Sequence, residues 1–182
     1  MGSAAGMHKN DFTLAELPGA LRRVFLMWRS SDRGDGVRLR DIDLAELSSD
    51  LDDIVLTEIH RDAATGTIDF EPVFLGKSVR DRTARPMIGK RLSTLPGKGP
   101  GSRTWAAYEA LAMGHGPLLA RLPYDGPAAG IAATNEVLLP LRPDEGTARA
   151  PRYALAGVRY VDAEDACVAE PATVGAASRR VP

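Results

Sequence analysis

Two strand-like segments separated by a four-residue turn constrain the fold of this chain more than any other feature. Residues 52–62 (DDIVLTEIHRD) and 67–79 (TIDFEPVFLGKSV) are rich in β-branched and aromatic residues, and the AATG between them is typical of a turn. The pattern predicts a β-hairpin. Pro72 lacks the backbone N–H that a strand ladder uses, so we expect the second strand of the hairpin at the edge of a sheet.

Two helices are predicted, one before the hairpin and one after it. In residues 13–31, four apolar side chains recur at three- and four-residue steps, which is the period of a helix with one apolar face. These residues are Leu21, Val24, Phe25 and Trp28. We expect this face to be covered, either by the rest of the domain or by a second copy of the chain, and we favour a homodimer. Residues 102–113 (SRTWAAYEALAM) form the second helix, with Ser102 as its N-cap.

Three further strands are predicted after the second helix, at residues 117–124, 134–143 and 152–161, with the turn-forming stretches DGPAAG and DEGTARA between them. A hairpin, a connector broken by Gly and Pro over residues 80–101, a helix and a three-stranded meander together predict a five-stranded antiparallel sheet with helices on one face. The first predicted helix is an additional element that precedes the sheet in the chain. The fold class is therefore α+β.

The predicted domain spans residues 17–161. Residues 1–16 are expected to form a flexible leader, and residues 162–182, rich in alanine and small polar residues, a disordered or loosely attached tail. No apolar run is long enough to cross a membrane, and the leader lacks the pattern of a secretory signal. Cys167 is the one cysteine, so no internal disulfide can form, and we expect a cytoplasmic protein.

Two glycine-rich stretches invite site interpretations that their spacing does not support. With Gly36 at the sixth position of an EF-hand calcium loop, Arg33 takes the third position and Ile42 the twelfth, where acidic ligands are required. We therefore expect SSDRGDG to be a turn. The stretch LGKSV resembles the end of a phosphate loop, but Glu71 stands where the first glycine is required.

No metal site and no chromophore are predicted. The histidines are His8, His60 and His115. His115, directly after the second helix, is the best candidate for an axial haem ligand, but GHG is also typical of a helix end, so we expect no haem. The net charge of −1 gives no overall field that would attract nucleic acid. The basic cluster RDRTAR, with Arg80, Arg82 and Arg85, is expected to face solvent rather than to bind phosphate or an acidic partner.

Several stretches, taken with this order of elements, resemble a bacterial family of PAS-like domains. They are Trp28–Arg29 at a helix end, LRDIDLAEL (39–47), LDDIVLTEI (51–59), DFEPVFLG (69–76), MIGKRL (87–92) and EVLLPLRPDEG (136–146). The resemblance covers residues 17–161 and contains no catalytic motif. The family typically has an aromatic–arginine pair in its second strand, where this chain has EPVF, so the resemblance leaves the pairing of that strand open.

The resemblance implies a sensory or regulatory domain of bacterial signalling that binds a small ligand or a protein partner and catalyses no reaction. In PAS proteins the sheet and its crossing helices enclose a small pocket, while the outer sheet face and flanking helices bind partners. On this mapping the pocket residues are Phe70, Phe74, Met87, Ile88, Leu92, Trp105, Tyr108, Leu119, Leu139 and Leu155, and the first helix meets a partner. We expect Tyr108 to orient a ligand, because its hydroxyl needs a partner when it is buried.

Three alternatives remain open at this stage. The pocket residues could form a filled core without a ligand, because aromatic and methionine side chains usually do so. The chain could be a small α+β enzyme with an acid–base pocket, for which Tyr108 and Glu109 are the candidates. It could also be a ligand-free dimerisation scaffold.

Overall fold

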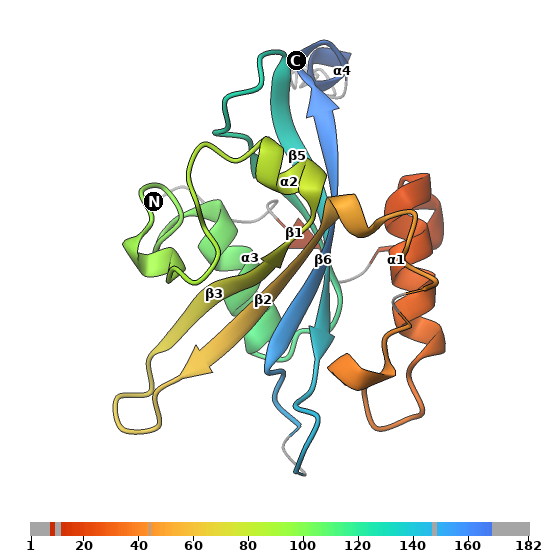
Figure 1. The fold of residues 1–182 in the computed structure, drawn as a ribbon, viewed down its shortest axis with the longest axis vertical. Helices are drawn as coiled ribbons and strands as arrows, with labels where there is room; N and C mark the ends of the chain where they lie inside the picture. Colours follow the sequence, from red (N-terminus) through yellow and green to blue (C-terminus); the bar gives the residue numbers. More distant parts are fainter. Residues whose placement is uncertain (1–7, 10–11, 44, 147–148, 169–182) are drawn as a thin grey trace, which may run out of the picture.

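Five long strands form one antiparallel sheet in the computed structural model, which describes residues 8–9, 12–43, 45–146 and 149–168 (Figure 1). In chain order the strands are β2 (Ile54–Arg61), β3 (Ile68–Leu75), β4 (Leu118–Pro123), β5 (Ile131–Leu141) and β6 (Tyr153–Asp162). Their order across the sheet is β4-β5-β6-β2-β3. The prediction of an α+β fold with a five-stranded antiparallel sheet is confirmed.

The two edges of the sheet are both partly blocked. β3 forms one edge, as Pro72 predicted. Pro72 lies opposite Thr57, and its carbonyl oxygen accepts a hydrogen bond from the N–H of Gly89 at 2.9 Å. At the other edge the two-residue strand β1 (His8–Lys9) pairs with Leu119 and Ala120 of β4. The segment that we expected to be a flexible leader therefore includes a strand that extends the sheet.

The helices lie before, between and after the strands. They are α1 (Gly19–Ser30), α2 (Lys77–Asp81), α3 (Arg103–Ala112) and α4 (Ala163–Val168), with the 3-10 helices η1 (Leu14–Glu16), η2 (Leu39–Asp41), η3 (Leu51–Asp53) and η4 (Leu92–Thr94). The Ser102 hydroxyl caps α3 by accepting a hydrogen bond from the Trp105 N–H at 3.0 Å, as predicted. α1 begins later than predicted because Pro18, with extended backbone (φ −52°, ψ 151°), separates it from η1. The predicted tail begins with α4, and residues 169–182 lie outside the described residues.

The loop that follows α1 is a turn held by one aspartate. The Oδ1 atom of Asp32 accepts hydrogen bonds from the N–H groups of Gly34 at 2.8 Å and Gly36 at 3.1 Å. Both glycines have positive φ, 100° and 90°, which other residues adopt at a cost. The stretch is therefore a turn in which an aspartate bonds its own backbone, as expected from the sequence.

The sheet separates two hydrophobic cores. One core lies between the sheet and α3, and includes Val55, Phe70, Trp105, Tyr108, Leu111, Leu138 and Val158. The other lies between the sheet and α1, and includes Leu21, Val24, Met27, Val137, Leu139 and Leu155. In Figure 1 α1 stands to the right of β6 and α3 to the left. We call these the inner core, on the α3 side, and the outer core, on the α1 side.

Candidate functional site

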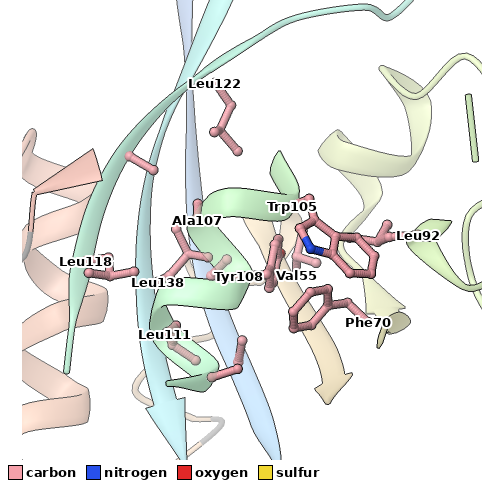
Figure 2. Close-up of a cluster of buried hydrophobic side chains, with 14 of the residues drawn as sticks. Val55, Phe70, Leu92, Trp105, Ala107, Tyr108, Leu111, Leu118, Leu122 and Leu138 are labelled. Carbon is pink, nitrogen blue, oxygen red and sulfur yellow. The ribbon is translucent and has the colours of Figure 1, made fainter. Parts of the chain in front are cut away.

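A small cavity of about 100 Å³ lies beside the inner core, between the sheet and the layer of α2, α3 and their connector. From the sheet it is lined by Val55, Leu122, Thr134, Glu136, Val158 and Tyr160, and from the other side by Val79, Arg82, Met87, Lys98, Thr104 and Tyr108. Figure 2 shows how α3 directs Trp105 and Tyr108 toward Val55 and Phe70 of the β2–β3 hairpin. Most of the wall is apolar, and a few polar groups reach into it.

Tyr108 is the most deeply buried polar side chain at the cavity. It is 5% exposed, and its ring lies 5.5 Å from that of Phe70, which meets Trp105 edge-to-face at 4.9 Å. The Tyr108 hydroxyl accepts a hydrogen bond from Thr57 Oγ1 at 3.3 Å. Burial raises the pKa of Tyr108, and the negative charge of Glu136 raises it further, so the phenol stays protonated. The bond from Thr57 is the one hydrogen bond of the Tyr108 hydroxyl among the described residues.

Glu136 brings a carboxyl group to the same cavity from the middle of β5. Its Oε1 atom accepts a hydrogen bond from Thr134 Oγ1 at 2.8 Å. Burial raises the pKa of Glu136, while the Thr134 hydrogen bond and the charge of Lys98 act in the opposite direction. A glutamate on a central strand, facing a cavity and a buried phenol, is an unusual use of a strand position that packing alone would fill with an apolar side chain.

Charged and aromatic side chains form the mouth of the cavity. Lys98 Nζ lies 3.0 Å from Asp125 Oδ1. The Arg82 guanidinium stacks over the Tyr160 ring at 4.8 Å from its centroid, and the Tyr124 hydroxyl donates to the Arg82 carbonyl oxygen at 2.8 Å. Burial raises the pKa of Tyr160 to about 12. These contacts hold the connector after α2 against the ends of β4 and β6.

Half of the predicted pocket residues lie together on the inner side of the sheet. Phe70, Leu92, Trp105 and Tyr108 belong to the inner core, and Met87 packs against it. Of these, Met87 and Tyr108 line the cavity, whereas the other three fill the space beside it. The structure therefore combines the two interpretations that we considered, a filled aromatic core and a small cavity next to it.

The other five predicted pocket residues lie elsewhere, and this part of the prediction is wrong. Leu119, Leu139 and Leu155 face the outer core, with Leu139 directly opposite Leu155 in the strand pairing. Phe74 and Ile88 are 41% and 47% exposed. The pairing of β2 with β3 shifts register between Leu56 and Thr57, so Phe74 pairs with Leu56 on the outer side although Phe70 faces inward.

The apolar stripe of α1 packs on the chain's own sheet. Leu21 and Val24 are each 1% exposed in the outer core, and Phe25 and Trp28 are partly buried. Trp28 Nε1 donates to the Pro140 carbonyl oxygen at 3.0 Å. Of the two arrangements considered for this stripe, the structure has the intramolecular one, and the homodimer stays a prediction.

Sequence reasoning missed Glu136, Thr134 and Lys98, and it chose Glu109, which is exposed on α3. The sequence gives no clear signal for Glu136, because it follows the polar residues Thr134 and Asn135 and precedes the apolar run of the strand. His115, the haem candidate, is also exposed, after the end of α3. Arg80 and Arg85 are exposed, as expected of that cluster, while Arg82 is partly buried on Tyr160.

A larger surface groove of about 650 Å³ runs between the end of α1 and the ends of β5 and β6. Two of its arginines, Arg38 and Arg142, share one ion-pair partner, Asp35, at 2.7 and 3.3 Å. The described residues include no group of three or more side chains placed to hold a metal ion. None of the helices in the described ranges has the length and apolar character needed to span a bilayer.

Searches against protein-family models, curated proteins and solved structures found no significant match to this chain.

Proposed function

We propose that the chain is a PAS-like regulatory domain that binds a small molecule in the cavity and signals its occupancy to a protein partner, without catalysing a reaction. We place it in the cytoplasm, because its single cysteine allows no internal disulfide. The order of elements supports the resemblance: a hairpin, a broken connector, a helix and a meander, with α1 added on the opposite face of the sheet.

The observation that carries this proposal is that β5 and β6 connect the cavity to α1. On β5, Glu136 lines the cavity, and its neighbour Val137 packs in the outer core. On β6, Val158 lines the cavity, and its neighbour Gly157 faces α1. Because side chains alternate between the two faces of a strand, adjacent residues of β5 and β6 contact the cavity and α1. A ligand that displaces either strand therefore also changes the packing of α1.

Native mass spectrometry and hydrogen exchange test this proposal together. We expect protein purified from its own host to carry a small molecule, and its removal by unfolding and refolding to change amide exchange in α1 as well as in residues 82–104. The turn at residues 62–67, remote from both, serves as the internal control and should not change. If a molecule binds but amide exchange in α1 is unchanged, the proposed effect of cavity occupancy on α1 is contradicted. If the protein retains no molecule, the ligand-free scaffold is favoured.

A second candidate, a small acid–base enzyme, is favoured by one observation. Glu136 has a raised pKa and stands at a cavity beside Tyr108, which is the arrangement expected of a general acid or base. The volume of about 100 Å³ is small beside the hundreds of Å³ of ordinary substrate pockets. Mass spectrometry of the Glu136→Gln variant separates the two. An enzyme should accumulate a molecule of different mass when Glu136 is replaced, whereas a binding domain should retain the same one.

A further inference from the structure

We propose that the groove between the end of α1 and the ends of β5 and β6 binds a small phosphate monoester, whose phosphate displaces the carboxylate of Asp35 from Arg38 and Arg142. The groove shares no lining residue with the cavity of the proposed function, so the two sites are independent.

Arg38 and Arg142 are a pair of cations on one wall of this groove. Their backbones form a single parallel bridge, where the loop after α1 meets the end of β5 (Figure 1). Like charges that lie opposite each other on neighbouring strands repel. Their side chains are only 17% and 12% exposed, so solvent screens this repulsion incompletely. Two guanidinium groups held together in this way need an anion beside them.

Asp35 supplies this anion. Its Oδ2 atom lies 2.7 Å from Arg38 Nη2 and 3.3 Å from Arg142 Nη1, so both guanidinium groups converge on one oxygen. The Asp35 side chain is 57% exposed, on a turn between Gly34 and Gly36. The backbone of that turn is held separately by the side chain of the preceding aspartate, as described above. Rotation of the Asp35 side chain into solvent would therefore free the arginine pair without unfolding the turn.

Three other acidic residues near the pair already accept hydrogen bonds from backbone N–H groups. Asp32, which also lines the groove, accepts two from the turn. Asp41 accepts from the N–H of Arg38 at 2.9 Å, and Asp144 accepts from the N–H of Arg40 at 3.1 Å. Asp35 is thus the acidic side chain that an incoming anion has to replace.

A dianion is favoured over a monoanion at this position. A ligand carboxylate would exchange one singly charged group for another, and it would compete with Asp35, which is tethered to the site at an effective concentration of about millimolar. A phosphate monoester carries a charge of about −1.5 to −2 at neutral pH and has three free oxygens, enough to pair with both guanidinium groups. Arg149, exposed on the same groove, adds a third cation.

The rest of the groove suits an organic group attached to the phosphate. Its volume of about 650 Å³ is within the range of small-molecule sites. The wall beside the arginines includes the apolar side chains Trp28, Val37, Pro117, Pro140 and Pro151. The hydrogen bond from Trp28 Nε1 to the Pro140 carbonyl oxygen fixes the indole ring, and a fixed indole favours contact with another flat ring. We therefore expect a ligand with a ring close to its phosphate.

Calorimetric titration of the full chain with phenyl phosphate, phenyl sulfate and methyl phosphate tests the proposal. Phenyl phosphate should bind most tightly, and its binding should strengthen as pH rises through about 6, where the second proton of a phosphate monoester is lost. Phenyl sulfate has the same ring and one negative charge at every pH, so it should bind more weakly and without this pH dependence. Methyl phosphate keeps the dianion without the ring, as a phospholipid headgroup would, and should also bind more weakly.

Three variants test the residues of the site. Arg38→Gln should weaken phenyl phosphate binding about tenfold or more, because hydrogen bonds to a charged group are lost. Asp35→Asn should tighten it about tenfold, the factor expected if the aspartate blocks the pair about nine-tenths of the time. Arg40→Gln is the matched control, because it removes the same charge from an exposed residue that does not line the groove. It should bind as the wild type does.

The contrary outcomes are equally specific. Phenyl sulfate that binds as tightly as phenyl phosphate would overturn the dianion, and methyl phosphate that does so would overturn the ring. Phenyl phosphate binding that Asp35→Asn does not tighten, or that Arg38→Gln weakens no more than Arg40→Gln, would overturn the site. Failure of phenyl phosphate to bind either the wild type or Asp35→Asn would overturn the proposal as a whole. The function proposed for the cavity is decided separately, by the molecule that the host protein retains and by α1 exchange. Circular dichroism of each variant confirms that it is folded.

Discussion

At the scale of single residues, the position of Glu136 makes the stability of the protein depend on pH. Burial raises its pKa, so the folded chain binds the Glu136 proton more tightly than the unfolded chain does. The stability that this proton contributes is present at low pH and is lost as pH rises through the folded-state pKa. Glu136→Gln cannot ionise, so its free energy of unfolding relative to the wild type should increase across this range. Urea denaturation at a series of pH values measures the difference.

The control for this prediction is Glu109→Gln, which removes a carboxylate from the exposed face of α3. The difference in free energy of unfolding between this variant and the wild type should be the same at every pH. If the Glu136→Gln curve is also parallel, the Glu136 side chain is solvated rather than enclosed.

At the scale of elements, α1 packs closely on β6 at Gly157. A Cβ atom at Gly157 would lie 3.3 Å from the Leu21 side chain and 3.4 Å from those of Val24 and Val137. Gly157→Ala should therefore push α1 outward and destabilise the protein by about 1 kcal/mol, the cost of overpacking less the gain from a less flexible unfolded chain. Gly19→Ala is the matched control, because its new methyl group meets nothing within 4 Å.

Chemical denaturation of both variants, with hydrogen exchange in α1, measures this effect. Gly19→Ala should be as stable as the wild type or about 0.5 kcal/mol more so. A Gly157→Ala protein as stable as Gly19→Ala would mean that α1 does not sit this close to the sheet.

At the scale of the whole molecule, α1 is a necessary cover for one side of the sheet. Without it Val137, Leu139 and Leu155, all under 5% exposed, would face water. A chain that begins after Ser30 should leave solution or elute in size-exclusion chromatography at a larger apparent mass than its own. Leu26→Ala, a change at a 43% exposed position of α1, should elute as the full chain does. A truncated chain that elutes as a compact single copy would contradict this role of α1.

The burial of both sheet faces also explains what the sequence could and could not predict. The strands, the turn, the Ser102 cap and the edge position of β3 depend on local patterns, so they could be predicted. The face of the sheet that each β5 side chain occupies could not be predicted. Val137, Leu138 and Leu139 are consecutive apolar residues that fill both cores, so they show no alternation of apolar and polar residues. For the same reason Leu139 and Leu155 were assigned to the wrong side. Glu136 was missed because its role depends on which face it occupies.

The blocked edges of the sheet have a consequence for how any partner can attach. Open strands recruit other chains by extending the hydrogen-bonded ladder, a route to specific complexes and also to aggregation. Here a proline interrupts one edge, and a short N-terminal strand shields part of the other. A partner must then recognise side-chain surfaces rather than a bare backbone, so peptide mimics of a strand should compete poorly for the complex, while substitutions on exposed faces should weaken it.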